Sequence, residues 1–504
     1  MFCYNTKSFT SEGPMESIRT EIAVIGAGPG GYTAAFYGAA LGKKVILIEQ
    51  EKRLGGACLN RGCISSKALL HIAKLIRETA DAGTWGVTFP KPVIHLDSLR
   101  AWKDSVLEKL GQGIANLAGR RNVQVITGRA AFEDPKTLRV ETAEGVRQIS
   151  FDQAIIATGS RAVLPPMFDL KDDRVMTSTE ALALGDIPGK LLVIGGGYIG
   201  MELGTVYAAL GSEVTVVEAM SGILPGADRD LARFVQERAS QIFKEIRLDA
   251  KVVALKSRPA KTRPARFRKR ARITKSQPEG IEVKMTLGGE TRDEIFDRVL
   301  VSIGRMPNSQ GLGLEKIQMK VNEKGFILVD RNQQTAVKDI YAIGDVTGGA
   351  LLAHKASKEA KVAVDAISGA ASSTKELLIP CVVFTDPEIA WCGLTEAEAK
   401  AKNISVQIVK FPWSASGRAL TLDRTDGVTK LLIDPQTEKI LGAGIAGAGA
   451  GELIGEGLVA VEAGMKARDL ARIAHPHPTL SETLMECAEM FYGHAPHAYS
   501  RKRD

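Results

Sequence analysis

The stretch TEIAVIGAGPGG (20–31) determines the fold expected at the start of the chain. Its apolar first half predicts a short buried strand, and the Ala-rich run that continues to Leu41 predicts a helix. A second apolar strand, KVILIE, ends at Glu49. This order of strand, glycine-rich turn, helix and strand is typical of a βαβ unit that binds a dinucleotide. The turn has G-x-G-x-x-G spacing, with its glycines at Gly26, Gly28 and Gly31.

The same pattern recurs in LLVIGGGYIG (191–200), which is followed by the strand EVTVVE ending at Glu218. Its glycines are Gly195, Gly197 and Gly200. In both copies the acid stands 23 residues after the first glycine. Glycines let the backbone approach a pyrophosphate at a helix N-terminus, and the acid binds ribose hydroxyls. The alternative is two buried strands with chance glycines, but two sites with matching spacing predict a flavin–nicotinamide enzyme.

A third segment with the same glycine spacing lies near the C-terminus, at Gly442, Gly444 and Gly447. The position 23 residues after its first glycine is Met465, so no acid is placed to hold a ribose. We therefore interpret this segment as a glycine-rich strand in a packed interface.

Two further segments, ATGS (157–160) and SIGRMPN (302–308), follow apolar strands, as chain crossovers between two dinucleotide-binding domains would. YAIGDV places Asp345 after another such strand, where its carboxylate can accept hydrogen bonds from a ribityl or phosphate group. From about Lys375 the chain alternates strands and helices and ends in HPHPTLSE. The expected fold class is α/β, with two Rossmann-like domains, for FAD and NAD, and a C-terminal α+β domain.

Composition excludes several classes of protein. The chain has 504 residues, of which 44% are hydrophobic and 25% charged, as in ordinary globular proteins. It contains no run of about 18 apolar residues, so no membrane association is expected. Six cysteines are too few for a disulfide scaffold in a chain of this length. The N-terminus lacks the apolar core of a secretory signal, and we expect a cytoplasmic protein.

The net charge of +8 comes from one basic segment. Residues 256–275 carry ten Lys or Arg and no acid, which leaves −2 for the rest of the chain. The segment separates two strand-like runs, KVVAL and GIEVKMTL, that would otherwise form a hairpin in the second dinucleotide-binding domain. With two prolines and one aromatic residue it cannot bury a core, so we expect a solvated loop. The alternative is a docking arm, and binding to nucleic acid, which is not expected, would rest on this segment alone.

Two cysteines mark a candidate redox site in GGACLNRGCISSK (55–67). Cys58 and Cys63 are five residues apart, a rise of about 7.5 Å in a regular helix. A disulfide requires Cα atoms within about 6.8 Å, so Gly62 and its neighbours must distort the turn. A helix N-terminus with Arg61 and Lys67 nearby favours a reactive thiolate. A metal site is not expected, because the chain has no C-x-x-C pair, and the alternative is two unrelated buried thiols.

A second candidate pair is His477 and Glu482. Pro478 suits a first helical turn, which predicts a helix over TLSETLMECAEM with Glu482 about one turn in. A carboxylate there can orient an imidazole and raise its basicity, as a general base requires. The alternative for a histidine before proline is a cap or core residue, as we expect for His475. The remaining C-terminal histidines, His494 and His497, lie in a polar tail and are expected to be solvated.

Taken together, these motifs resemble those of the class I flavin pyridine nucleotide–disulfide oxidoreductases, and among them the dihydrolipoamide dehydrogenase branch of bacterial type. The likeness extends over residues 18–490 and includes GG-x-C-L-N-x-G-C-I-x-S-K and the terminal H-P-T-L-S-E. Arg61 stands where the family usually has Val, and Ser65 where it usually has Pro. The insertion 256–275 and the tail beyond Phe491 have no counterpart in that pattern.

The resemblance implies a role for individual residues. It implies that FAD is held by Gly26, Gly28, Gly31, Glu49, Lys67, Gly128, Asp345 and Ala353. It implies that NAD is held by Gly195, Gly197, Gly200, Glu218, Val252 and Gly304. The implied catalytic residues are Cys58, Cys63, His477 and Glu482, and no metal ligand is implied.

The resemblance also implies the organisation of the chain. Six segments are expected: a disordered tail (1–17), an FAD-binding domain (18–160), an NAD-binding domain (161–300), a central domain that completes the FAD site (301–374), an interface or dimerisation domain (375–490) and a C-terminal tail (491–504).

The implied activity is oxidation of dihydrolipoyl groups by NAD⁺ through a Cys58–Cys63 disulfide. The implied partners are a second copy of the chain, the lipoylated acyltransferase of 2-oxo acid dehydrogenase complexes, and a small dithiol substrate. Glutathione reductase is a rival because it shares the cysteine pair, although it uses NADPH. Mercuric reductase needs a second, C-terminal cysteine pair, and a flavin transhydrogenase of this fold lacks the redox cysteines. A polyanion-binding adaptor acting through the basic segment is the rival from a different class.

Overall fold

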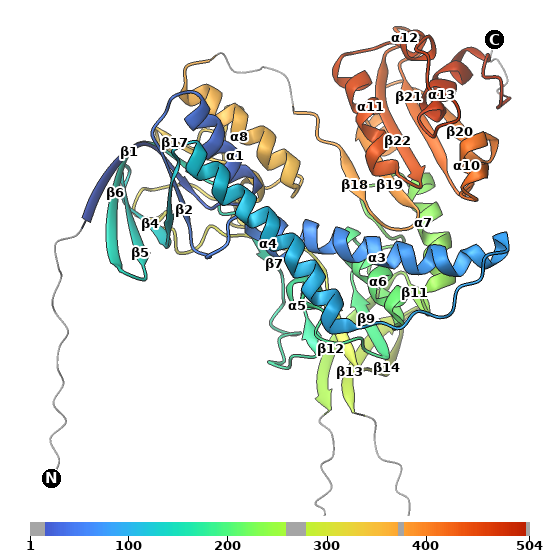
Figure 1. Ribbon diagram of the computed structural model, residues 1–504, viewed down its shortest axis with the longest axis horizontal. Coiled ribbons are helices and arrows are strands. Elements are labelled where there is room, and N and C mark those ends of the chain that lie inside the picture. The colour runs from blue at the N-terminus through green and yellow to red at the C-terminus, as the bar shows by residue number, and fades with distance from the viewer. Residues whose placement is uncertain (1–15, 259–278, 371–376, 500–504) are drawn as a thin grey trace, which may run out of the picture. The chain divides into compact units, whose positions relative to one another are not determined.

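The computed structural model describes residues 16–258, 279–370 and 377–499, and Figure 1 shows their helices and strands. The chain forms two compact units, each built from three stretches of sequence. The first unit takes the described residues of Met1–Asn60, Ser105–Arg161 and Arg305–Glu376. The second takes those of Arg61–Asp104, Ala162–Gly304 and Leu377–Asp504. The chain thus passes between the units after Arg161, one residue beyond ATGS, and after Gly304, within SIGRMPN, at the two predicted crossovers.

The first unit contains a mainly parallel sheet in the strand order β3, β2, β1, β6, β17, extended by the antiparallel strands β5 and β4. The strands are β1 (Glu16–Ile25), β2 (Val45–Glu49), β3 (Gln124–Thr127), β4 (Arg129–Asp134), β5 (Thr137–Thr142), β6 (Gly145–Ile156) and β17 (Ile340–Ala342). Helices α1 (Pro29–Ala40) and α8 (Ala353–Ile367) lie side by side and pack with strand residues in one apolar cluster (Figure 1).

Burial on both faces explains the apolar character of these strands. All five residues of β2 are buried, as expected for a parallel sheet covered on both sides. The predicted strand and the predicted helix are confirmed, but β1 starts at Glu16, inside the predicted tail 1–17. Its first residues pair with β6, for example Ile18 with Ile149, but their side chains alternate between polar and apolar. Because they form no apolar run, the sequence did not predict them as part of the strand.

The second unit repeats this βαβ arrangement in a parallel sheet of order β11, β10, β9, β15, β8. Its strands are β8 (Val175–Met176), β9 (Lys190–Ile194), β10 (Glu213–Val217), β11 (Glu245–Arg247) and β15 (Arg298–Val301). The associated helices are α5 (Ser178–Ala183), α6 (Tyr198–Leu210) and α7 (Arg229–Ile242). The predicted second strand–glycine turn–helix–strand repeat is therefore confirmed.

A three-stranded antiparallel sheet in the second unit contains the predicted hairpin. Strand β12 (Ala250–Arg258) pairs with β13 (Gly280–Leu287), which pairs with β14 (Glu290–Phe296). Residues 256–258 of the basic segment belong to β12, and its residues 259–275 lie outside the described residues. The prediction of a strand on each side of the segment is confirmed.

The last part of the second unit is an α+β fold around the antiparallel sheet β18–β19–β22–β21–β20. The strands are β18 (Cys381–Val383), β19 (Glu388–Gly393), β20 (Gln407–Pro412), β21 (Val428–Ile433) and β22 (Ile440–Gly447). The helices are α9 (Glu396–Ala401), α10 (Gly417–Thr421), α11 (Ala450–Glu462), α12 (Ala467–Ala471) and α13 (Glu482–Tyr492). Strand β22 is the third glycine-rich segment, buried between two neighbouring strands, so its interpretation as a packed strand is confirmed.

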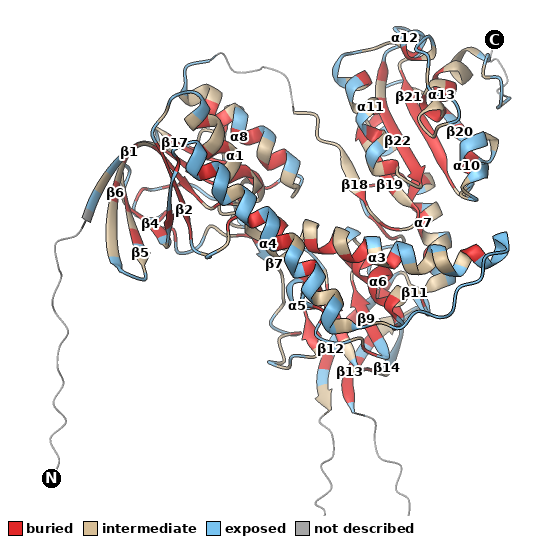
Figure 2. Cartoon of the chain, in the orientation of Figure 1, coloured by how far each residue is buried: buried red, intermediate tan, exposed pale blue. Residues whose placement is uncertain are grey.

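The remaining elements connect these sheets. They are α2 (Gly56–Arg61), α3 (Cys63–Asp81), α4 (Leu96–Arg120), the short paired strands β7 (Ser160–Ala162) and β16 (Arg305–Pro307), and the 3₁₀ helices η1 (Ala82–Trp85), η2 (Gly344–Thr347) and η3 (Trp413–Ala415). In Figure 2 buried residues follow the strands, whereas helices such as α8 and α11 have one buried side and one exposed side. None of the helices in the described ranges is both long enough and apolar enough to cross a membrane.

Candidate active site

The first glycine-rich turn has the close packing that a dinucleotide site needs. A Cβ atom on Gly31 would lie 1.7 Å from the carbonyl oxygen of Gly26, so only glycine lets α1 start this close to β1. The buried carboxylate of Glu49 accepts a hydrogen bond of 2.7 Å from the backbone N–H of Ala27. Burial raises the pKa of Glu49, while backbone N–H donors act against that increase. The acid is thereby held beside the turn, as ribose binding requires.

The second turn has the same construction in the second unit. Glu218 accepts hydrogen bonds from the backbone N–H of Gly196, at 2.6 Å, and of Met220, at 2.8 Å. A Cβ atom on Gly200 would lie 2.1 Å from the carbonyl oxygen of Gly195. A Cβ atom on Gly197, the residue that precedes α6, would meet no atom within 4 Å. The helix N-terminus is therefore open to a pyrophosphate, and both turns fit dinucleotides.

The other residues predicted for FAD lie in the first unit, apart from Lys67. The backbone N–H of Gly128 donates a hydrogen bond of 2.8 Å to the carbonyl oxygen of Glu49. Asp345 lies in η2, and Ala353 is the first residue of α8. The carboxylate of Asp345 accepts a hydrogen bond from the hydroxyl of Ser160. These contacts place a carboxylate and a helix N-terminus in the unit that contains the first turn, and their assignment to FAD stays a prediction.

Lys67 has a partner that the sequence did not indicate. Its ammonium lies 2.9 Å from the nearest carboxylate oxygen of Glu202, on α6, and 4.4 Å from the centre of the Phe384 ring. Glu202 is buried and also accepts a hydrogen bond of 3.0 Å from the backbone N–H of Phe384. The two ionic groups are 135 residues apart in sequence, so no local pattern connects them. The predicted role of Lys67 at FAD is untested by these contacts.

The other two residues predicted for NAD, Val252 and Gly304, lie in the second unit, which also contains the second turn. Val252 lies on β12, whose first residue, Ala250, donates a backbone hydrogen bond of 3.0 Å to the carbonyl oxygen of Glu218. Gly304 follows β15 and accepts a backbone hydrogen bond of 3.1 Å from Val163. Both positions are thus fixed by backbone contacts within the second unit, and their assignment to NAD stays a prediction.

The two candidate redox cysteines lie on either side of a break between helices. Cys58 is half-buried in α2, and Cys63, which is exposed, is the first residue of the 19-residue helix α3. The intervening Gly62 has φ −151° and ψ −121°, far from the helical region. The predicted distortion of the turn at Gly62 is therefore confirmed. Cys63 stands at a helix N-terminus, where the aligned peptide dipoles favour a thiolate.

His477 and Glu482 lie together, as predicted. The imidazole Nδ1 lies 2.9 Å from Glu482 Oε1, and the other carboxylate oxygen accepts a hydrogen bond of 2.7 Å from the backbone N–H of Thr479. Burial of Glu482 opposes ionisation, but the bonds from Thr479 and His477 outweigh it and lower the pKa of this carboxyl. Because Nδ1 faces the carboxylate, Nε2 is the nitrogen that can take up a proton.

The expected helix around this pair is shorter than predicted. Helix α13 starts at Glu482 rather than near Pro478, so Glu482 stands at its first position and not one turn in. The reason is the bond from Thr479 N–H to Glu482, which closes a non-helical turn before the helix. The orienting carboxylate therefore lies at a positive helix end, where negative charge is stabilised.

The other C-terminal histidines have partners of their own. His475 Nε2 lies 2.7 Å from Glu456 and its Nδ1 lies 2.8 Å from the carbonyl oxygen of Ile473, which agrees with the expected core or cap role. His494 is exposed, as expected. His497 is exposed as well, but its Nδ1 lies 2.7 Å from the buried Glu486, so the expectation of simple solvation is wrong for this residue. A buried carboxylate on α13 requires a polar partner, and the tail supplies it.

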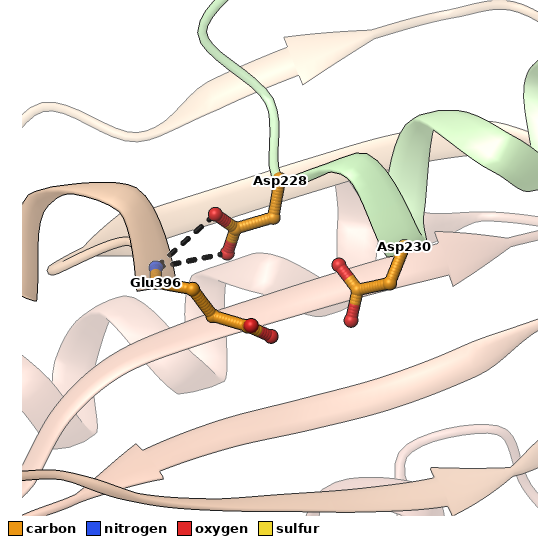
Figure 3. Close-up of side chains that lie close together, drawn as sticks. All are labelled: Asp228, Asp230 and Glu396. Carbon is orange, nitrogen blue, oxygen red and sulfur yellow. Dashed lines mark hydrogen bonds between the residues drawn. The ribbon is translucent and has the colours of Figure 1, made fainter. Parts of the chain in front are cut away.

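Figure 3 shows the carboxylates of Asp228, Asp230 and Glu396 close together. One possible ligand atom from each lies within 4.8 Å of those of the other two. A buried lysine occupies the place that a metal ion would take: Lys430 Nζ lies 2.6 Å from Asp228, and 2.9 Å from each of the other two carboxylates. A second ammonium, of Lys410, lies 2.6 Å from Asp230. We assign this cluster to structure, since it joins the start of α7 to the C-terminal sheet through ion pairs.

Comparison with known proteins assigns both halves of the chain to one family. Residues 20–360 match the family model described as pyridine nucleotide-disulphide oxidoreductase. Residues 379–488 match its dimerisation domain.

Curated relatives and solved structures agree with this assignment. The chain is 41% identical to dihydrolipoyl dehydrogenase of Vibrio cholerae, over 97% of this chain and 99% of that protein. It is 42% identical to the protein of that name from Buchnera aphidicola, over 95% and 97% of the two chains. Among solved structures, LpdA of Mycobacterium tuberculosis superimposes with a TM-score of 0.83 at 27% identity, covering 93% of this chain and 99% of that one. The flavoprotein disulfide reductase RclA of Escherichia coli superimposes with a TM-score of 0.79 at 29% identity, covering 93% and 99%. The chain therefore belongs to the pyridine nucleotide-disulphide oxidoreductase family.

Proposed function

We propose that the protein is a dihydrolipoyl dehydrogenase, which oxidises dihydrolipoyl groups to the cyclic disulfide and reduces NAD⁺ with the help of FAD. The observation that carries the proposal is the break at Gly62, with one cysteine in α2 and the other at the start of α3. Relatives of that name, 41–42% identical over at least 95% of this chain, support the lipoyl substrate.

The chain's own residues carry the dithiol chemistry. His477, held through Nδ1 by Glu482, removes the proton from one thiol of the substrate. The resulting thiolate attacks Cys58, which breaks the Cys58–Cys63 disulfide and releases Cys63 as a thiolate. The second substrate thiol then attacks the substrate sulfur bonded to Cys58, so that the substrate disulfide closes and Cys58 leaves. Two electrons have then passed to the cysteine pair, one proton to His477 and the other to Cys58.

The cofactors are held by the two turns and their neighbours. When bound, FAD would supply an electron acceptor for the cysteine pair and a hydride donor for NAD⁺. The residues proposed to hold FAD are Gly26, Gly28, Gly31, Glu49, Lys67, Gly128, Asp345 and Ala353. The residues proposed to hold NAD are Gly195, Gly197, Gly200, Glu218, Val252 and Gly304.

We also propose a cytoplasmic homodimer that serves the lipoylated acyltransferase of a 2-oxo acid dehydrogenase complex. The match of residues 379–488 to a dimerisation domain supports the homodimer. The names of the relatives support the acyltransferase partner. Which 2-oxo acid complex is served depends on the acyltransferase rather than on the redox site.

Anaerobic titration of the purified yellow protein with dihydrolipoamide tests the proposal. A thiolate next to an oxidised flavin gives a long-wavelength absorption band, and we expect this band to grow with added dithiol. Oxidised glutathione with NADPH is the control, because a glutathione reductase would reduce that disulfide with NADPH instead. A protein that binds flavin but is not reduced by dihydrolipoamide would overturn the proposal.

The nicotinamide cofactor should be NAD rather than NADP. The carboxylate of Glu218 would repel a 2′-phosphate, and residues 219–228 contain no Lys or Arg. The nearby guanidinium of Arg247 is bound by Glu245, at 2.6 Å, and by Glu294, at 2.8 Å. A repulsion of about 3 kcal/mol corresponds to a preference of roughly 100-fold, at about 1.4 kcal/mol per tenfold. The ratio of kcat/KM for NAD⁺ to kcat/KM for NADP⁺ measures this preference.

Glu218→Gln is the matched variant for this prediction. The amide oxygen can still accept a backbone hydrogen bond at the turn, but the negative charge is lost, so the preference for NAD should fall while folding persists. An NADP preference in the unmodified protein would contradict the assignment of Glu218.

Removing the basic insertion should leave the chemistry intact. The structure places residues 256–258 in β12, so the deletion is best made over 259–278 with a short Gly/Ser turn between β12 and β13. The strand ends are already held together by Arg258, which bonds Glu282 at 2.9 Å. We expect the pI to fall from about 9.0 and turnover of free dihydrolipoamide to change less than about twofold, as for other changes outside the core.

Flavin content and thermal unfolding complete this experiment. Loss of bound flavin or a lower unfolding temperature would show that the segment is structural. Salt-sensitive binding to a polyanion that disappears with the deletion would instead support the docking-arm alternative.

A further inference from the structure

The two segments that the sequence predicts as crossovers are hydrogen-bonded to each other through residues of the first unit. The side-chain amide of Asn308 donates to the carbonyl oxygen of Thr158 at 2.9 Å, and the hydroxyl of Thr158 donates to the carbonyl oxygen of Asn308 at 2.8 Å. The short strands β7 and β16 pair next to these bonds. The two crossovers are therefore hydrogen-bonded to each other, and they contain Ser160 and Arg305.

Arg305 and Ser160 form a directed chain of hydrogen bonds that ends on Asp345. The guanidinium of Arg305 donates from Nε to the hydroxyl oxygen of Ser160 at 2.7 Å, and from Nη2 to its carbonyl oxygen at 2.8 Å. Since arginine only donates, the Ser160 hydroxyl must accept, and its single hydrogen is given to Asp345 Oδ2. Ser160 is buried, and the Nε atom of Arg305 lies 3.8 Å from that same carboxylate oxygen.

The turn that carries Asp345 is also fixed from α8. The backbone N–H of Gly344 donates to Glu359 at 2.7 Å, and Glu359 forms a buried ion pair of 2.8 Å with Lys355. The ammonium of Lys355 lies 3.3 Å from the carbonyl oxygen of Gly344. The backbone of Gly344, next to Asp345, is thus held by the Lys355–Glu359 pair, and the Asp345 carboxylate is held by Ser160 with Arg305 behind it, which leaves the side chain little freedom to rotate.

We propose that Ser160 and Arg305 are positioning residues for FAD, which keep the Asp345 carboxylate oriented toward a ribityl hydroxyl. The inference rests on the proposed function, because it requires that Asp345 bind FAD. A carboxylate that is already ordered loses little side-chain entropy when the cofactor binds.

The test measures FAD affinity of the apoprotein by quenching of flavin fluorescence, with Ser160→Ala, Ser160→Thr and Arg305→Met. A hydrogen bond to a charged group corresponds to roughly 10- to 100-fold in affinity, and we expect Ser160→Ala and Arg305→Met to weaken FAD by that factor. Ser160→Thr keeps the hydroxyl and should restore binding. Arg161→Met is the matched control, because Arg161 bonds to Pro307 and Asn308 in the same crossover but not to Asp345.

A double-mutant cycle separates positioning from a general structural role. If the hydrogen-bonded chain from Arg305 through Ser160 acts through Asp345, Ser160→Ala should weaken FAD binding little further in an Asp345→Asn background. Equal weakening in both backgrounds, or unchanged affinity in the single variants, would overturn the inference while leaving the proposed function in place. Wild-type protein that binds no FAD would overturn the proposed function, and the inference with it. Thermal unfolding of each apoprotein identifies a variant that has failed to fold. In that case the FAD affinity of Ser160→Thr, which keeps the hydroxyl, tests the inference.

Discussion

Mixing two inactive variants, Cys58→Ser and His477→Gln, is expected to restore dihydrolipoamide oxidation once their subunits exchange. The expectation follows from the position of the proposed base. His477 and Glu482 lie in residues 379–488, the part of the chain that matches a dimerisation domain, and His477 is more than 400 residues from Cys58. In the resembled family this domain forms the subunit interface, so we predict that His477 serves the cysteines of the other subunit.

The arithmetic of the mixture makes the test decisive. If the base acts across the interface, each heterodimer has one site with both substitutions and one intact site. Random exchange of equal amounts then recovers about a quarter of the wild-type sites, because half of the dimers are mixed. If the base acts within its own subunit, both sites of every heterodimer stay broken and the mixture remains inactive.

The single variants set the scale. Removing a general base costs about 10²- to 10⁴-fold in rate, which is the loss expected for His477→Gln. Glu482→Gln should cost less, roughly 10-fold, because its amide oxygen still accepts a hydrogen bond from Nδ1 while the charge is lost. His494→Gln is the matched control, since this histidine is exposed and lies in the same C-terminal region. Its turnover should equal that of the wild type.

Much of this fold could be predicted from local pattern. Both βαβ units can be recognised from an apolar run, a glycine-rich turn and an acid at fixed spacing, because all of these features lie within one short segment of sequence. The missed start of β1 has the opposite cause. Ser17 and Ile18 belong to a strand only because β6 pairs with them, and nothing in their own side chains requires it.

In the candidate site, too, contacts between residues near in sequence could be predicted, whereas contacts between distant residues could not. His477 and Glu482 are five residues apart, so chain proximity predicts their contact. Glu202 and Arg305 escaped prediction because their partners, Lys67 and Ser160, lie more than 100 residues away. Ion pairs and relays of that kind depend on tertiary packing, which no window of sequence contains. The buried Lys430 is the extreme case, since its three carboxylate partners come from two distant segments.

The second large effect concerns the identity of the flavin-facing thiol. We expect Cys58→Ser to lose dithiol oxidation entirely but to keep a long-wavelength thiolate–flavin band, and Cys63→Ser to lose both. Cys63 is the first residue of α3, where the helix N-terminus stabilises a thiolate, and it is the residue released when a substrate attacks Cys58. Lowering the pH should protonate the thiolate and bleach the band of Cys58→Ser.

The remaining cysteines of the described ranges cannot produce this signal. Burial raises the pKa of Cys381, and it raises the pKa of Cys392 and of Cys487 to about 12, so all three are protonated at neutral pH. Cys381→Ser is therefore the matched control, and its spectrum and turnover should equal those of the wild type. A band that survives in Cys63→Ser and vanishes in Cys58→Ser would exchange the two assignments: Cys58 would face the flavin, and Cys63 would be the sulfur that the dithiol attacks.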